Sequence, residues 1–423
     1  IRDRKLVQET EKEHEDILEQ ADETDAVFGE LYRWYLRNPE YRSRVQKLVQ
    51  SAFAGKPKDI ISQSVAKALY GEVSPYSATR LERFAACAFA HFLQYGMKLT
   101  ERVEYEFKPM DMGNVMHEAL ESFAEEVRKR GMKWTELTEQ ERNEIADRCL
   151  DNIVADYGNT VLKSSARNEY MIERTRRILR RTVWALQKQL EQGEFQPEGF
   201  EVTFGGGRID RVDIMEDQNK VYVKVIDYKT GNTSFDLVYL YHGLQLQLMI
   251  YLDGALRVEQ KKYPDKEIIP AGVFYYNIKD PMIQEKIDAD VEAVSAGLMK
   301  ELKMNGLVQA DPELVYRMDS SLGSIPVAFN KDGSFRKNSS VADRTQFAVL
   351  GRYVRTKIEK IRSSILEGDA EVSPYELGKK NACTYCPYMT VCGFDRRLSG
   401  YEFRRLKNFS DEELWKAFDR EAE

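Results

Sequence analysis

Four cysteines are arranged unevenly along this 423-residue chain: Cys87 is isolated, whereas Cys383, Cys386 and Cys392 lie together near the other end. The close set has the spacing C-x2-C-x5-C, which leaves Cys87 as the candidate for a fourth metal ligand. Zinc sites commonly use two local C-x2-C pairs, whereas three clustered cysteines and one distant cysteine better match a [4Fe–4S] cluster. The spacing favours the cluster and leaves zinc open. Either metal would close a very long loop of chain.

The composition is that of an ordinary globular chain, with 42% hydrophobic and 31% charged residues. No apolar run reaches the roughly 18 residues that a membrane span needs, and no signal peptide is visible, so we expect no membrane contact and a cytoplasmic location. Disulfides are rare in the cytoplasm, so none is assigned. The fifth cysteine, Cys149, lies in a helical apolar pattern and is interpreted as a small buried hydrophobe.

The charge balance bears on nucleic-acid binding. Lysine and arginine number 63 against 70 aspartate and glutamate, a formal charge of -7, which argues against indiscriminate coating of nucleic acid. A local basic channel stays open, because affinity for phosphates depends on where the cations cluster. The run from Arg174 to Arg181 is such a cluster, and it predicts either a channel or a solvated helix face.

Hydrophobic periodicity predicts a set of helices followed by a mixed core. Residues 1 to about 70 have the pattern of charged amphipathic helices, and the chain begins at Ile1 rather than Met, so we expect a fragment of a longer protein. Ser77 is the predicted N-cap of the helix that leads to Cys87, and a further helix starts at Gly113. The predicted strands cover 200–204, 208–215, 221–228 and 271–277, and later helices cover 241–256, 283–305 and 341–367. This order predicts an α/β core with large helical insertions.

An Asp-x-Lys sequence closes the third predicted strand. Asp227 and Lys229 are two residues apart, so their side chains leave the strand on the same face. Asp210, at the turn into the neighbouring strand, is expected to meet Asp227 across a hairpin. Such carboxylates repel unless a cation separates them, and Mg2+ suits these oxygen ligands together with water and phosphate. Lys229 would favour the hydroxide form of the attacking water, which indicates metal-assisted phosphodiester hydrolysis, although the bare motif is weak.

Three further side chains are candidates for this site. His117 lies one position off the apolar stripe of its helix, where it would flank the site or simply remain an exposed or satisfied histidine. Gln247 and Tyr251 are four residues apart on the predicted helix after the third strand and would give it one polar edge for phosphate or water. The alternative for this pair is ordinary amphipathicity, with Tyr251 in the core.

Taken together, these segments resemble the RecB-type branch of the PD-(D/E)xK nucleases. The resemblance is carried by SATRLERFAAC ending at Cys87, GNVMH ending at His117, GRID ending at Asp210, VIDYK ending at Lys229 and QLMIY ending at Tyr251. With the C-x2-C-x5-C set, the match narrows to the iron–sulfur nuclease domains of AddAB-type helicase–nucleases. The implied fold is a restriction-endonuclease-like α/β core with large helical insertions, closed by a four-cysteine iron–sulfur staple.

The resemblance also implies roles for individual residues. Mg2+ would be held by His117, Asp210 and Asp227, water activation would fall to Lys229, substrate contact to Gln247 and Tyr251, and a [4Fe–4S] cluster to Cys87, Cys383, Cys386 and Cys392. The implied activity is exonucleolytic hydrolysis of single-stranded DNA, on the 5′-terminated strand, during the processing of double-strand breaks. An AddA-type helicase–nuclease subunit would be the partner, supplying the motor and cutting the other strand.

The resemblance divides the chain into three parts and shows two departures. We expect residues 1–72 to be a helical remnant of a preceding helicase-like region, 73–400 to be the nuclease domain, and 401–423 to be a C-terminal helical tail. Family members often have proline where this chain has Ala88, a change beside a ligand and not at one. Without the helicase-like domains, the chain is expected to cut DNA but not to unwind it.

Two other interpretations remain. The first is a nuclease-dead module for DNA binding or assembly, stapled by the cluster, although the presence of the full acidic, histidine and lysine set favours an active enzyme. The second is one of the related nucleases of CRISPR adaptation, which are much shorter, so the long helical insertions argue against it.

Overall fold

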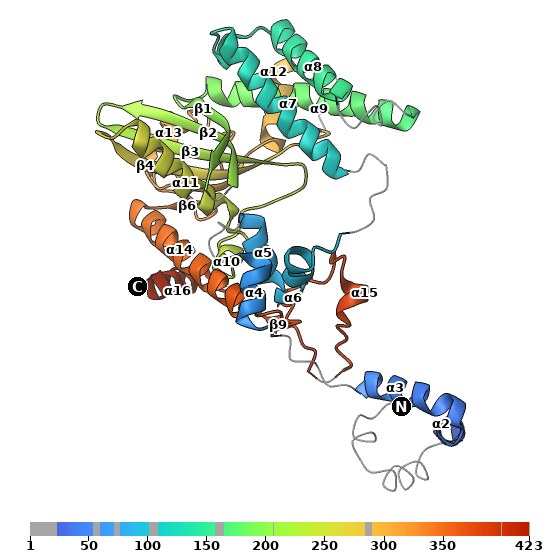
Figure 1. Ribbon diagram of the computed structural model, residues 1–423. Helices are drawn as coiled ribbons and strands as arrows, with labels where there is room; N and C mark the ends of the chain where they lie inside the picture. The colour runs from blue at the N-terminus through green and yellow to red at the C-terminus, as the bar shows by residue number, and fades with distance from the viewer. Residues whose placement is uncertain are drawn as a thin grey trace.

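The computed structural model describes residues 23–53, 60–71, 77–100, 109–156, 165–205, 207–283, 290–398 and 400–422. A central sheet separates a layer of long helices above it from a second helical layer below it (Figure 1). The helices α2 (Glu23–Arg37) and α3 (Pro39–Phe53) pack against each other at the N-terminal end of the described chain.

The central sheet has six strands in the order β1-β2-β3-β4-β5-β6. The first three form an antiparallel meander, β4 runs parallel to β3, β5 is antiparallel to β4, and β6 is parallel to β5. The strands are β1 (Gln196–Phe204), β2 (Gly207–Asp217), β3 (Lys220–Lys229), β4 (Glu267–Asn277), β5 (Asn305–Gln309) and β6 (Val341–Ala342). The β3–β4 crossover contains a helix, which is the usual way to join parallel neighbours.

Side-chain alternation along β3 supplies both hydrophobic cores. Val221, Val223 and Val225 pack into the hydrophobic core between the sheet and the lower helical layer, the lower core. Tyr222 and Ile226 pack into the core between the sheet and the upper helical layer, the upper core. A strand buried on both faces has a nearly continuous apolar sequence, and β3 is buried from Val221 onward. Asp227 and Lys229 continue the valine series, so their side chains leave the sheet on the face that packs against α11.

Three long helices form the upper layer and pack on one another, and α7 packs on β1. They are α7 (Pro109–Lys129), α8 (Glu139–Asp156) and α9 (Ala166–Glu191). Apolar residues at helical spacing on α7, among them Met116, Leu120 and Phe123, are almost completely buried in this core. Shorter elements at the same end are a 3-10 turn (Trp134–Glu136), α12 (Val291–Glu301) and α13 (Pro312–Met318).

The lower layer is built on α11 (Gln247–Lys262) and α14 (Arg344–Glu367), with α4 (Gln63–Tyr70), α5 (Ala78–Ala86), α10 (Leu237–Tyr241) and α16 (Asp411–Ala422) around them. Gly254 on α11 is required by close packing, because a Cβ there would lie 2.6 Å from the ring of Phe204. The helix therefore lies directly against the end of β1. This contact fixes α11 beside the strands that carry the acidic residues.

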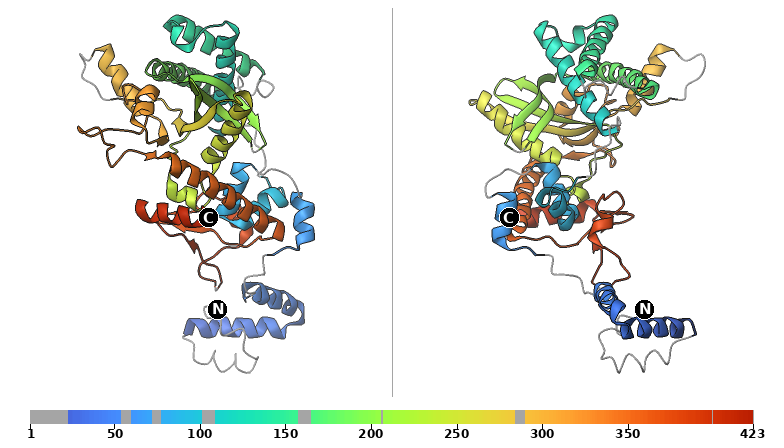
Figure 2. Two further views of the ribbon diagram at one scale, coloured as in Figure 1. Left: turned by 90° about the vertical axis from the view of Figure 1, so that its left-hand side faces the viewer. Right: turned by 45° about the vertical axis from the view of Figure 1, so that its right-hand side comes forward.

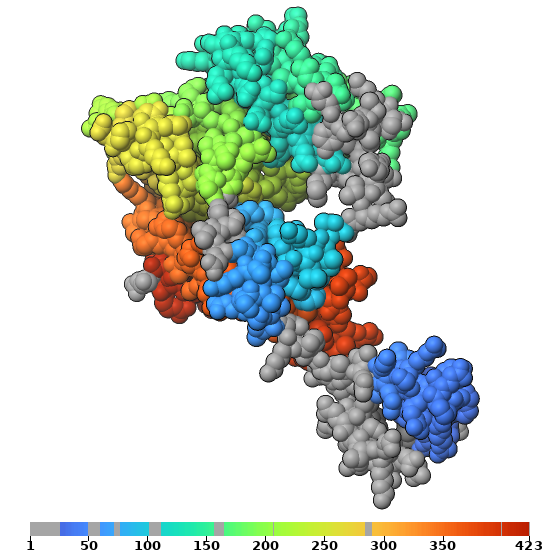
Figure 3. Space-filling model, viewed as in Figure 1, coloured from blue at the N-terminus to red at the C-terminus, as the bar shows by residue number. Residues whose placement is uncertain are grey.

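Two segments far apart in the sequence, around residues 60–96 and 368–405, meet in the lower half of the molecule. Ile61 N donates to Gly368 O at 2.9 Å, and Phe89 N donates to Glu371 O at 3.0 Å. The space-filling view shows the segment of α4, α5 and α6 (Ala88–His91) against the C-terminal segment (Figure 3), and the turned ribbons agree (Figure 2). A π-helical turn (Phe92–Gly96), α15 (Met389–Cys392) and a small sheet of β7 (Tyr375–Leu377), β8 (Lys380–Asn381) and β9 (Arg404–Arg405) complete this region.

Several predicted elements differ from the observed ones. The helix predicted over 241–256 is wrong at its start, since α10 ends at Tyr241 and α11 begins only at Gln247. The helix predicted over 283–305 is wrong at its end, where β5 begins at Asn305, and 284–289 lie outside the described residues. Asp210 lies within β2 rather than at a turn. The strands predicted over 200–204, 208–215, 221–228 and 271–277 and the Ser77 cap are confirmed.

Two observations concern the ends of the predicted domains. The helix α4 packs on α14, and α16 packs on α14 and α10. The predicted boundaries at 72 and 400 stay predictions. Within the described ranges, no helix is both long enough and apolar enough to cross a membrane.

Candidate active site and cysteine group

Strand register places three acidic residues in one row across β1, β2 and β3. The residues next to Glu201 on β1 pair with the residues next to Asp210 on β2, so Glu201 and Asp210 lie opposite each other. The register between β2 and β3, continued by one residue, sets Asp227 opposite Asp210. Residues opposite one another on neighbouring strands have their Cβ atoms about 5 Å apart. Asp210 Oδ2 also accepts a hydrogen bond of 2.7 Å from Tyr228 N, which holds its carboxylate beside the end of β3. Like charges opposed in this way destabilise a sheet unless a cation lies between them.

Asp227 is the most deeply buried member of this row, with 1% of its surface exposed. Burial, together with the neighbouring charge of Asp210, raises its pKa to about 7 against the opposing effect of Lys229. Asp227 Oδ2 lies 2.6 Å from Lys229 Nζ as an ion pair, yet no well-aligned hydrogen bond reaches this buried oxygen. The oxygen is thus paired with the ammonium group by charge, and a carboxylate oxygen keeps lone pairs for an additional ligand such as a cation.

His117 reaches the same row from α7. Its Nδ1 lies 3.4 Å from Asp210 Oδ2 and 3.8 Å from Glu201 Oε1. Burial lowers its pKa, but hydrogen bonds and charge from both carboxylates outweigh burial and raise the pKa to about 10. Glu201 has a backbone φ of +49°, an uncommon conformation for a residue other than glycine, and it also forms an ion pair with Arg208.

A chain of polar contacts extends from Asp227 to the helix α11. Lys229 Nζ donates to Gln247 Oε1 at 2.8 Å, and Gln247 Nε2 donates to Tyr251 Oη at 2.9 Å. The ammonium group also lies 5.4 Å from the centre of the Tyr275 ring, within the range of a cation–π contact. Lys229 is thus held between a carboxylate, an amide oxygen and an aromatic face, with its nitrogen at the acidic row.

Glu82 on α5 binds the backbone at the start of α11 and so supports this series of polar contacts. Its Oε1 accepts hydrogen bonds from Leu246 N at 2.7 Å and from Gln247 N at 2.9 Å. Burial raises the pKa of Glu82 to about 7, although these two backbone hydrogen bonds act in the opposite direction. The first residues of α11 are therefore anchored to a helix from a distant part of the sequence.

Every residue predicted for the hydrolytic site lies in this one region: His117, Asp210, Asp227, Lys229, Gln247 and Tyr251. Tyr251 is 8% exposed in the lower core, as the alternative interpretation had it, and its hydroxyl bonds Gln247, while its contact with substrate stays a prediction. Sequence reasoning missed Glu201 and Glu82. Counting back from the turn between β1 and β2 would have set Glu201 opposite Asp210. No local pattern marks Glu82, because its partners lie 164 and 165 residues away.

The donor set fits a hard divalent cation. Among the described residues, His117, Glu201 and Asp210 form the one group of three potential ligand atoms that all lie within 4.8 Å of one another. Asp227 borders this group and carries the buried oxygen that no well-aligned hydrogen bond reaches. Carboxylate oxygens with one imidazole suit Mg2+ or Mn2+. The residues present therefore fit the predicted magnesium, with Glu201 as an additional candidate ligand.

The four predicted cysteine ligands line one small cavity of about 20 Å3, together with aromatic side chains. Burial raises the pKa of Cys383 to about 12, with neighbouring Cys87, Cys386 and Cys392 thiols adding to the rise. All four are free thiols, as is Cys149, which is buried as predicted. The four thiols therefore lie around one cavity, and their binding of a metal, [4Fe–4S] or zinc, stays a prediction.

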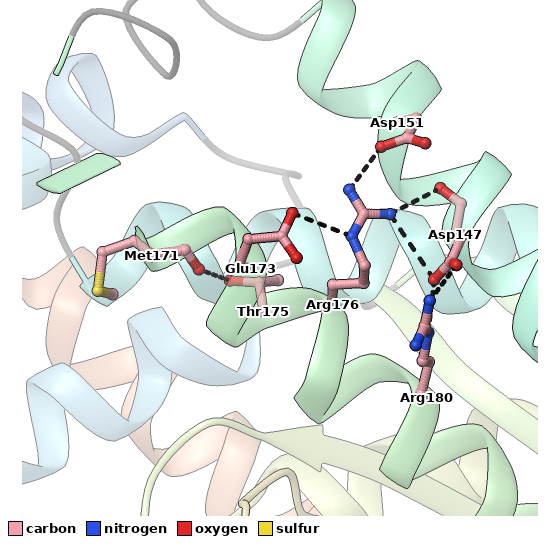
Figure 4. Close-up of polar contacts among 7 residues, drawn as sticks. All are labelled: Asp147, Asp151, Met171, Glu173, Thr175, Arg176 and Arg180. Carbon is pink, nitrogen blue, oxygen red and sulfur yellow. Dashed lines mark hydrogen bonds and ion pairs between the residues drawn. The ribbon is translucent and has the colours of Figure 1, made fainter. Parts of the chain in front are cut away.

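The basic run on α9 is largely paired with acidic side chains (Figure 4). Arg176 lies 2.7 Å from Asp151 and 3.7 Å from Asp147, and Arg180 also pairs with Asp147. Arg177 reaches Asp280 at 2.6 Å. These pairs join α9 to α8 and to the segment after β4, which favours the interpretation as a helix face over that as a phosphate channel.

Comparisons with known proteins agree with this geometry. The model of the PD-(D/E)XK nuclease superfamily matches residues 75–393. A protein of Lachnoclostridium phytofermentans, named as the B subunit of an ATP-dependent helicase/deoxyribonuclease, is 41% identical over 425 aligned residues, which cover 95% of this chain and 36% of that protein. Proteins of the same name from Thermoanaerobacter sp. and Clostridium acetobutylicum are 34% identical and cover 95% and 94% of this chain. The chain spans a little over a third of the length of these relatives.

Proposed function

Because this chain belongs to the PD-(D/E)XK nuclease superfamily, we propose that it hydrolyses phosphodiester bonds of single-stranded DNA with Mg2+. The observation that carries the proposal is the acidic row beside Lys229. Three carboxylates and His117 converge where a hard cation would be held, and Lys229 Nζ lies 2.6 Å from the Asp227 carboxylate. A DNA-binding module without catalysis has no chemical use for such an arrangement.

Each residue of the site has a distinct proposed role. Asp210, Asp227 and His117 would hold Mg2+, with Glu201 beside them. When bound, the ion would supply Lewis-acid polarisation of the scissile phosphate and activation of water. Lys229, oriented by Gln247, stabilises negative charge that develops on the phosphate and favours the deprotonated form of the attacking water. Tyr251 fixes the amide of Gln247 so that its oxygen faces the lysine.

The relatives' name suggests the setting for this reaction. By that similarity we propose that the chain is the nuclease part of a helicase–nuclease that processes double-strand breaks, with an AddA-type subunit as partner. In this setting it would act as an exonuclease on the 5′-terminated strand, while the partner supplies unwinding. Cys87, Cys383, Cys386 and Cys392 would hold a [4Fe–4S] cluster, with zinc as the alternative, and would tie the two ends of the sequence together.

The test is digestion of a single-stranded oligonucleotide in the presence of Mg2+ by the native protein and by Asp227→Ala. Oligonucleotides labelled at the 5′ or the 3′ end report the polarity of degradation. We expect Mg2+-dependent products from the native protein and none from the variant. Equal products from both proteins would overturn the catalytic assignment. DNA binding without cleavage by both would support the nuclease-dead module instead.

A further inference from the structure

The helix α11 begins without a cap of its own. Its N-cap residue is Leu246, which provides no side-chain hydrogen bond to the first turn. The first backbone N–H groups of a helix have no partner within the helix and need one from elsewhere. Glu82 Oε1 meets that need at two of them, Leu246 N and Gln247 N, from a different helix. A carboxylate at this position also interacts favourably with the helix dipole.

The capped residue is the one that orients the lysine of the site. Gln247 is the first residue of α11, its backbone N–H is bound by Glu82, and its side-chain oxygen accepts the bond from Lys229 Nζ. The same side chain is fixed on its other side by Tyr251. A shift in the start of α11 would therefore move the amide oxygen to which Lys229 is bound.

Glu82 is itself held on a firmly packed helix. The neighbouring side chains Leu81 and Phe84 are 1% and 9% exposed in the lower core, and Ser77 caps the start of α5. The two hydrogen bonds that its carboxylate accepts come from the first amides of α11. Glu82 belongs neither to the acidic row nor to the group of potential metal ligands. Its hydrogen-bonded route to Lys229 runs through Gln247, and its charge also acts on Lys229 and Asp227, an effect that a variant without the charge but with the acceptor separates from capping.

We propose that Glu82 is a positioning residue of the nuclease site: by capping α11 it fixes Gln247, and through Gln247 it holds Lys229 in its catalytic orientation. This inference rests on the proposed function. It adds a residue from α5 to a site otherwise built from β1, β2, β3, α7 and α11. Its chemical requirement is a hydrogen-bond acceptor of the right length at residue 82.

The kinetic test compares Glu82→Gln, which retains an acceptor oxygen of the same reach, with Glu82→Leu, which retains the size but no acceptor. Displacing a catalytic group by about 1 Å can cost roughly 100-fold in rate, so we expect Glu82→Leu to lower kcat about 10- to 100-fold with little change in KM. Glu82→Gln should stay within about threefold of native kcat. Glu359→Leu, on an exposed stretch of α14, is the matched control and should leave kcat unchanged.

A double-mutant cycle separates positioning from simple destabilisation. If Glu82 acts through Gln247, adding Glu82→Leu to Gln247→Ala should lower kcat by less than about twofold beyond Gln247→Ala alone, since coupled residues are not additive. Losses that multiply would overturn the proposal, as would a Glu82→Gln protein as impaired as Glu82→Leu. Thermal unfolding of each variant shows that the kinetic comparison concerns folded protein.

Hydrogen exchange distinguishes failure of this proposal from failure of the proposed function. Amides of Leu246 and Gln247 should exchange faster in Glu82→Leu than in the native protein, and at native rates in Glu82→Gln. This result is readable even if the native protein and Asp227→Ala prove equally inactive, which would overturn the function alone. Native exchange rates in Glu82→Leu would overturn the cap, whatever the activity.

Discussion

The acidic row and the cysteine group are assembled in opposite ways. Glu201, Asp210 and Asp227 lie in paired strands of a six-stranded sheet, and backbone hydrogen bonds set their spacing. The cysteine group joins the start of α6 to a segment of short strands and a four-residue helix. Its apolar packing is a small cluster around Cys87 and Tyr388, with a hydrogen bond of 2.9 Å from Tyr388 Oη to Leu99 O.

Each region therefore obtains its order from a different source. The sheet would hold the acidic row in place even at a cost in repulsion, because its register is fixed by many neighbouring pairs. The cysteine segments have few such pairs, so a bound metal would supply much of their stability. We therefore expect loss of a ligand to affect chemistry at the first site and folding at the second.

The largest expected effect is loss of cleavage in Asp227→Asn. Removing this proposed metal ligand would forfeit several kcal/mol of transition-state stabilisation, about a 1,000-fold lower rate. The apparent melting temperature in the absence of divalent ions should stay equal or rise, because a buried charge disfavoured by burial and by Asp210 is removed. Kinetics and thermal unfolding of the same preparation check both points. A large drop in the melting temperature of Asp227→Asn would show that folding depends on the native side chains of the acidic row, as it is expected to depend on those of the cysteine group.

The second effect concerns Cys383→Ala. Loss of this thiol should lower the melting temperature by about 5 °C or more and weaken DNA binding, because it would remove a ligand of the proposed metal that ties distant segments together. The buried Cys149→Ala variant is the matched control and should keep its metal. Metal and sulfide analysis of the native protein separates [4Fe–4S] from zinc. A well-folded Cys383→Ala protein with native DNA affinity would contradict a structural role for the cysteine group.

A smaller effect is expected at Glu201, one of the two residues that sequence reasoning missed. Glu201→Gln removes one of two carboxylates that raise the pKa of His117, so that pKa should fall towards its ordinary value. Cleavage should drop about tenfold, less than in Asp227→Asn, because Asp210 and Asp227 remain. Titration of the His117 ring by NMR measures the first effect. An unchanged His117 titration would remove Glu201 from the site.

The smallest effect is a dependence on pH that Mg2+ can shift. Protonated Asp227 and His117 are poor ligands, and their pKa values are raised to about 7 and about 10, so binding of a cation must release protons. Affinity for Mg2+ and cleavage at low Mg2+ should therefore rise from about pH 6 to about pH 10, first as Asp227 and then as His117 loses its proton. Raising the Mg2+ concentration should move this rise in cleavage rate to lower pH. If the rise stays at the same pH at every Mg2+ concentration, it is caused by groups other than Asp227 and His117.

Local patterns predicted much of this molecule. Alternating valines placed β3 and set Asp227 and Lys229 on one face, and the i, i+4 spacing of Gln247 and Tyr251 correctly indicated a shared edge. The start of α11 was missed because Leu240, Leu244 and Leu248 recur every four residues, as in a continuous helix, while the chain instead turns between α10 and α11. Gly243 has a φ of +77°, a conformation that ends regular helix.

Contacts between distant segments were beyond sequence reasoning. Glu82 meets Leu246 only after α5 and α11 have packed against each other, and nothing local distinguishes it from a surface glutamate. The arginines of α9 showed the reverse problem. Their density suggested a phosphate channel, but the acidic partners lie on α8 and beyond β4, so the charges cancel only in three dimensions.

The packing of α16 has a practical consequence for protein engineering. Leu414 and Phe418 are buried, and the ring of Phe418 lies 4.8 Å from that of Tyr353 and 5.5 Å from that of Tyr241. Trimming the chain before Asp411 to obtain a minimal cutting unit would expose this aromatic surface, at a cost of about 1.5–3 kcal/mol for each large side chain uncovered. A shortened version intended for expression or crystallisation should keep this helix, although it carries no residue of the site.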